Sequence, residues 1–193
     1  MPRDALVAFS RDKGCLPLTT QLCQMLSMAE SLCGPQITGY ALTGWQLTTE
    51  SQPDITFFPI SNSRTNIIVQ LTTNCFAFPL RAEFQMSHEV IHALSPRVRG
   101  TSTVFEEGVA VFFSLEYCRF RGSPHPETMI GDTRYISAYQ LVNKMLQSQT
   151  NAVSTLHGLR QQYGSFSSVP IDALEKCFPK MSHMEMQILS AKW

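Results

Sequence analysis

Two histidines and a glutamate in residues 88–92 constrain this chain more than any other feature of its sequence. His88 and His92 are four residues apart, so on an α-helix they project from nearly the same face, where both imidazoles can reach one metal ion. Glu89 lies one position round the helix, close enough to contact a water on that metal. The pattern His-Glu-x-x-His therefore predicts a helix that binds Zn²⁺ through two neutral imidazoles, beside a carboxylate that takes a proton from the bound water.

Chance is a poor explanation for this pattern. With 5 histidines in 193 residues, roughly 1 in 150 chains of this composition would contain it somewhere. A lone buried histidine is usually only hydrogen-bonded, whereas a metal accounts for both rings and for the nearby carboxylate together.

Length and charge limit the classes of function. The 193 residues are expected to form a single domain, 1–193, long enough to bury a sizeable core. Formal net charge is zero and 16% of residues are charged, against a usual share of about 25%, so nucleic acid is not an expected partner. The apolar run at residues 5–9 is too short for a signal-peptide core, and no stretch approaches a membrane span. We therefore expect a cytoplasmic protein without a membrane span, which leaves secretion by a non-standard route open.

The six cysteines are expected to be buried thiols. They include no Cys-x-x-Cys pair, which argues against a zinc ribbon. A domain of this length also does not need disulfides to fold.

The sequence pattern over residues 19–71 predicts one helix and a small sheet. Apolar residues recur at helical spacing over 19–33 and stop at a Gly-Pro pair. Three β-leaning stretches, 37–47, 54–60 and 66–71, follow and predict a small, mainly antiparallel sheet. The third is either an edge strand, which could hold an extended peptide by β-augmentation, or a fully paired inner strand.

The metal helix is expected from Pro79 to Leu94, because proline suits a first helical position and Ser95 precedes another proline. The helices expected after residue 103 include 134–147, which begins after Asp132 or Thr133, 151–163 and 170–178. A small sheet followed by helices places the chain in the α+β class.

A catalytic zinc usually takes three protein ligands, so a carboxylate on the next helix should complete the site. Glu106 and Glu107 both qualify by position. The pattern Thr103-x-x-Glu106 matches a capping box, in which Glu106 would fold back onto the Thr103 backbone amide. That structural role favours Glu107 as the ligand without excluding Glu106.

The metal motif from His88 to His92, followed by a Glu-Gly-x-Ala sequence that starts at Glu107, resembles the gluzincin metallopeptidases. In that family the third ligand is a glutamate on the helix after the active-site helix, often followed by Gly and a small residue. The resemblance covers about residues 66–145, and the short connection over 93–106 is similar to that of minimal gluzincins. It implies a zincin-like fold in which an edge strand of the sheet borders the cleft. It also implies His88, His92 and Glu107 as zinc ligands and Glu89 as the general base.

In similar gluzincins a tyrosine or histidine from the following helix donates to the developing oxyanion, which makes Tyr135, Tyr139 and His125 candidates. The resemblance thus implies a zinc-dependent peptidase acting on a peptide or protein substrate. The alternative is a catalytically silent zincin-fold module that binds or regulates a partner, although the intact Glu89 favours the active enzyme. A di-iron carboxylate site is disfavoured because the chain has no second Glu-x-x-His.

Overall fold

The computed structural model describes residues 18–76, 79–96 and 102–193. The strands are β1 (Tyr40–Thr48), β2 (Asp54–Ser61) and β3 (Arg64–Thr72). The α-helices are α2 (Leu18–Cys33), α3 (Pro79–Leu94), α4 (Val104–Phe120), α5 (Thr133–Gln147), α6 (Ala152–Tyr163), α7 (Ile171–Cys177) and α8 (His183–Ser190), and three short 3-10 helices are η1 (Thr73–Phe76), η2 (Pro126–Met129) and η3 (Phe166–Ser168). The α+β class is as predicted, and the predicted helices and strands are present with small differences at their ends. Helix α8 was not predicted.

The three strands form a mixed sheet in the order β1-β3-β2. β2 and β3 make an antiparallel hairpin, but β1 runs parallel to β3, so the predicted mainly antiparallel sheet is correct for only one of the two pairings. β3 is the central strand, and the interpretation of residues 66–71 as an edge strand is therefore wrong. Its fully buried side chains, Ile67, Val69 and Leu71, alternate along the strand and form the inner face of the sheet.

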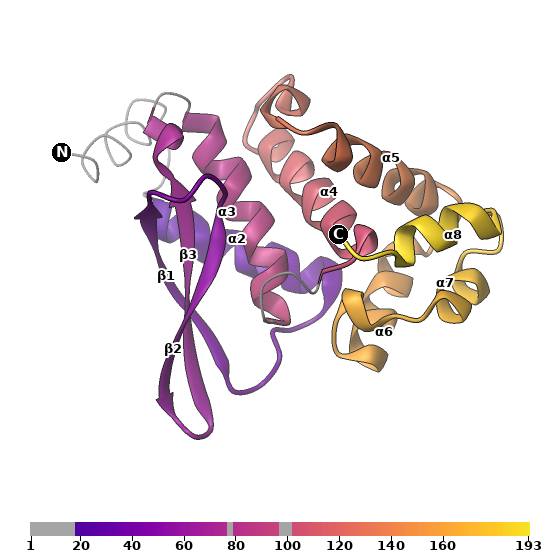
Figure 1. Ribbon diagram of the computed structural model, residues 1–193, viewed down its shortest axis with the longest axis horizontal. Helices are drawn as coiled ribbons and strands as arrows, with labels where there is room; N and C mark the ends of the chain where they lie inside the picture. The colour runs from indigo at the N-terminus through magenta and orange to yellow at the C-terminus, as the bar shows by residue number, and fades with distance from the viewer. Residues whose placement is uncertain (1–17, 77–78, 97–101) are drawn as a thin grey trace.

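The helices extend outward from that inner face in layers. α3 contacts α2 and β3, α4 packs on α3, and α5 packs on the far side of α4 (Figure 1). The shorter helices α6, α7 and α8 gather at the end of this assembly farthest from the sheet. Helix α3 is therefore largely enclosed by other elements.

A buried arginine fastens the ends of two helices to α6. Arg160 is 3% exposed, and its guanidinium donates to the carbonyl oxygens of Cys33, Gly34 and Pro35 after α2 and of Leu94 at the end of α3. Its Nε donates to the Ser95 hydroxyl at 3.0 Å. Cys33 and Leu94 are the last residues of their helices, so their carbonyls receive no hydrogen bond within them, and a cation at helix C-termini also interacts favourably with the helix dipoles.

The cysteines in the described residues are free thiols. Cys33, Cys75 and Cys118 are buried as predicted, Cys177 is partly exposed, and the prediction is wrong for Cys23, which is exposed. Cys15 and most of the loop before α4, residues 97–101, lie outside the described residues. Within the described part of the chain, no helix combines the length and apolar character needed to cross a membrane.

Candidate metal centre

Helix α3 places the two histidines of the motif side by side. His88 and His92 lie one turn apart near its C-terminal end, and their ring centroids are 5.0 Å from each other. The two Nε2 atoms are 3.2 Å apart, so both rings direct the same nitrogen to one point. His88 is 6% exposed, and this point therefore lies inside the protein.

Helix α4 brings Glu107 to the same point. Its Oε2 lies 3.2 Å from His88 Nε2, and its Oε1 lies 3.6 Å from His92 Nε2. Ligand atoms held tetrahedrally at about 2.0–2.1 Å from zinc lie about 3.3 Å from one another. Two imidazoles and a carboxylate at this spacing fit a metal of the zinc type, and His88, His92 and Glu107 are the group in the described residues that could hold one.

The charges in the site favour a cation. Burial opposes ionisation of Glu107, but His92 and His88 outweigh this effect and hold the pKa of Glu107 below its usual range. Burial also opposes a charge on His92, whereas Glu107, Glu106 and Glu89 together raise the His92 pKa well above its usual value. Several carboxylates in one buried place require a compensating positive charge, which either a proton on His92 or a divalent ion could supply.

Glu106 contacts the opposite side of the His92 ring. Its Oε1 lies 2.9 Å from His92 Nδ1, and its Oε2 accepts from both the backbone amide and the hydroxyl of Ser167. The predicted capping box is therefore only half correct. The Thr103 hydroxyl does accept from the Glu106 amide, but the Thr103 amide donates to the Ser167 hydroxyl and not to the Glu106 side chain.

Glu89, the predicted general base, is 5% exposed on α3. Burial raises its pKa, and the positive character of His92 and His88 acts in the opposite direction. Glu107 and Asp54 add smaller effects that raise it. The carboxyl thus lies within electrostatic reach of all three metal-ligand candidates and of the first residue of β2.

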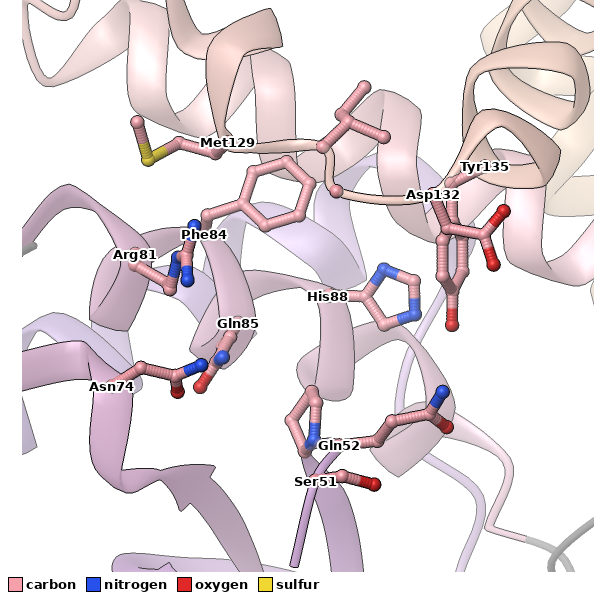
Figure 2. Close-up of a pocket in the computed structure, with 13 residues that line it drawn as sticks. Ser51, Gln52, Asn74, Arg81, Phe84, Gln85, His88, Met129, Asp132 and Tyr135 are labelled. Carbon is pink, nitrogen blue, oxygen red and sulfur yellow. The ribbon is translucent and has the colours of Figure 1, made fainter.

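A cavity of about 220 Å³ opens beside His88. Its lining comes from the loop before β2, from η1 and α3, and from the stretch between the end of η2 and the first turn of α5, with Phe84, Met129 and Tyr135 contributing apolar surface. Figure 2 shows the Tyr135 ring next to His88, and the two ring centroids are 5.6 Å apart at nearly right angles. Burial, with Glu107 and Glu89 nearby, raises the pKa of Tyr135, so its hydroxyl keeps its proton and can donate.

The residue after Glu107 explains how α5 comes close enough for this contact. A Cβ on Gly108 would lie 2.6 Å from the carbonyl oxygen of Ala138 and 2.6 Å from a methyl carbon of Val142, both on α5. No such distance occurs between real atoms of this kind, so the packing of α4 against α5 requires glycine here. The glycine of the Glu-Gly sequence thus has a packing role that brings Tyr135, one turn before Ala138, towards the site.

The other two candidate donors lie elsewhere. Tyr139 does not line the cavity, and its hydroxyl bonds to Arg119, which helps to raise the Arg119 pKa. His125 is exposed next to η2 and does not line the cavity. Of the three, only Tyr135 meets the candidate ligands.

Two residues at the site were not found from the sequence. Ser167, which lies in η3, donates its backbone amide to the Glu106 carboxylate. The Trp193 ring packs on Tyr135 with a centroid distance of 4.7 Å. The Trp193 amide donates to the Ser102 carbonyl, which fixes this end of the chain against the start of α4. Both contacts join positions far apart in sequence, so no local pattern indicates them.

Comparisons of the chain with models of known protein families, with curated proteins and with solved structures gave no match. The residues and geometry of the site are therefore the basis for inferring its function.

Proposed function

We propose that this protein is a zinc-dependent peptidase with a zincin-like fold of the gluzincin type. The observation that carries the proposal is the convergence of two Nε2 atoms and the Glu107 carboxylate at separations of 3.2–3.6 Å, next to a buried glutamate and an open cavity. A purely structural zinc site is usually closed by four protein ligands and needs neither an adjacent base nor a cavity.

His88, His92 and Glu107 would hold the ion, and zinc bound there would supply a Lewis acid that lowers the pKa of a water and polarises the scissile carbonyl. Glu89 accepts the proton of the attacking water and passes it to the leaving amine. The Tyr135 hydroxyl donates to the oxygen that becomes negatively charged. Each of these groups comes from a helix that is fixed by packing on its neighbour, which favours a preorganised site.

The sheet offers a place for an extended substrate. β2 pairs with β3 on one side only within the described residues, and the residues just before it, Ser51 to Pro53, line the cavity. Pro59 lies within β2, as is typical of edge strands. A peptide added to the outer edge of β2 would run past the cavity, which would receive one of its side chains.

The first test is metal content and metal-dependent cleavage. The purified protein should contain about one zinc per chain by elemental analysis and should cleave casein or a peptide library. A chelator should abolish cleavage, and added zinc should restore it. A protein that neither contains zinc nor takes it up from solution would refute the proposal.

Glu89→Gln separates binding from catalysis. It removes the base but no ligand, so zinc content should stay near one per chain while cleavage falls by about 10²–10⁴. The matched control is Glu116→Gln on exposed surface of α4, which should change neither quantity. Loss of zinc in Glu89→Gln would mean that Glu89 is a ligand. Zinc binding without any cleavage by the unaltered protein would favour the silent partner-binding module.

A further inference from the structure

The two nitrogens of His92 face different partners. Nε2 faces His88 Nε2 at 3.2 Å and Glu107 at 3.6 Å, where a metal would be held. Nδ1 faces Glu106 Oε1 at 2.9 Å on the other side of the ring. A neutral imidazole carries its proton on only one of these nitrogens, and only the unprotonated one can bind a metal.

A hydrogen-bond chain leads from backbone amides to Nδ1, and its direction can be deduced. The Thr103 amide can only donate, and it donates to Ser167 Oγ at 3.0 Å. Ser167 Oγ therefore uses a lone pair there and directs its own proton to Glu106 Oε2. The Ser167 amide donates to the same Oε2 at 3.0 Å. Oε2 thus accepts two hydrogen bonds, and Oε1 is left to accept from His92.

We propose that Glu106 is a positioning residue that fixes the tautomer of His92. As a carboxylate it can only accept, so it keeps the ring proton on Nδ1 and leaves the Nε2 lone pair facing Glu107 and His88. The use of this tautomer for metal binding rests on the proposed function, but the tautomer itself does not. Glu106 is 5% exposed, and water cannot easily replace it as the acceptor.

Glutamine is the sharpest replacement because it has nearly the shape of glutamate. Its carbonyl oxygen must occupy the place of Oε2, since that atom receives two donors from Ser167. Its NH₂ group then faces Nδ1 and donates to it, which forces the ring proton onto Nε2. Aspartate is one methylene shorter but still only accepts. Control of the tautomer therefore ranks Asp above Gln, whereas a role in filling space ranks Gln above Asp.

Zinc affinity, measured by competition with a chromophoric chelator at fixed pH, tests this ranking. Glu106→Gln should weaken zinc binding by about 10–100-fold, the usual cost of losing the partner of a metal-binding histidine. Glu106→Asp should lose less, and the exposed control Glu116→Gln should bind as the unaltered protein does. At a pH high enough to leave His92 neutral, the metal-free melting temperature of Glu106→Gln should stay close to that of the unaltered protein. Zinc binding by Glu106→Gln that equals or exceeds that of Glu106→Asp would overturn the inference.

A second measurement does not depend on zinc. NMR of metal-free protein with ¹⁵N-labelled histidine, at a pH high enough to leave the ring neutral, reports which nitrogen of His92 carries the proton. We expect Nδ1–H in the unaltered protein and Nε2–H in Glu106→Gln. A proton on Nε2 in the unaltered protein would overturn the inference even if zinc binds. Failure to bind zinc would instead count against the proposed function, while this spectrum still decides the tautomer.

Discussion

Replacing Gly108 by alanine tests whether the close packing of α4 on α5 shapes the site. The new Cβ would lie 2.6 Å from the Ala138 carbonyl oxygen, whereas ordinary van der Waals contact begins at 3.4 Å. The obstacle is backbone, so no side-chain rotation relieves it, and α5 must retreat by about 0.8 Å.

The expected cost in stability is moderate. Overpacking of this kind costs about 1–3 kcal/mol, and the better helix propensity of alanine offsets up to about 1 kcal/mol of that. A net loss of about 1–2 kcal/mol in the free energy of unfolding should lower the melting temperature by about 2–8 °C in a domain of this size.

The effect on cleavage should be larger than the effect on stability. Tyr135 is one turn before Ala138 on α5, so the retreat moves its hydroxyl relative to His88 on α3. A misplacement approaching 1 Å can cost about 10²-fold in rate. Zinc affinity should change much less, because all three candidate ligands lie on α3 and α4.

Gly158→Ala is the matched control. Gly158 lies inside α6, and a Cβ there would meet nothing within 4 Å. This variant should gain about 0.5–1 kcal/mol with unchanged cleavage. Thermal melts, peptide cleavage rates and zinc titration on both variants check the reasoning. If Gly108→Ala is stabilised as much as Gly158→Ala and cleaves at the normal rate, the contact with α5 does not constrain the site.

Three further predictions follow from single residues. Arg160→Met removes the guanidinium donor of the Cys33, Gly34 and Pro35 carbonyls and should lower the free energy of unfolding by about 3–5 kcal/mol in urea titrations, at about 1–3 kcal/mol for each buried group left unpaired. A loss below about 1 kcal/mol would contradict its role as a fastening group. Tyr135→Phe should reduce kcat by about 10²–10³ with zinc retained, and Tyr139→Phe should be nearly neutral, whereas equal effects in steady-state assays would reject Tyr135 as the oxyanion donor. Burial raises the pKa of Cys33 to about 12, so iodoacetamide at pH 8 should modify the exposed Cys23 before Cys33. Mass spectrometry of timed samples would show this order, and equal rates of modification in the folded protein would refute the burial of Cys33.

The parts of the fold that depend on residues close together in the sequence could be predicted. Helix α2 stops at Gly34, which has φ of 89°, a conformation that suits glycine. Asp132 caps α5 through its side chain, as its position before the helix indicates. The two candidate metal ligands on α3 could be predicted in the same way, because four-residue spacing alone places both rings on one face of a helix.

Strand pairing could not be predicted in the same way. β1 and β3 are separated by β2 in sequence, yet they lie side by side and parallel. Alternation of apolar residues indicates which face of a strand is buried but not which strand is its neighbour. The hairpin of β2 and β3 was the easier case, because a short turn between consecutive strands nearly determines their antiparallel pairing.

A Ser/Thr-x-x-Glu pattern occurs twice at the start of a helix, with different outcomes. At Ser182 and Glu185 both reciprocal bonds form, and this capping box begins α8. The pattern therefore could have predicted α8, the α-helix that the sequence analysis does not include. At Thr103 and Glu106 only the bond from the threonine side chain forms.

Burial explains the difference. A buried histidine N–H without an acceptor costs about 1–3 kcal/mol, and Glu106 is the acceptor that faces His92 Nδ1. The second bond of a capping box contributes only part of the roughly 1 kcal/mol that a cap provides. Ser167 supplies the Thr103 amide with another acceptor, so turning Glu106 towards His92 leaves no group unpaired. The local sequence indicates which backbone groups need partners. In a buried site, however, a side chain turns towards the group that would cost more free energy if it were left without a hydrogen bond.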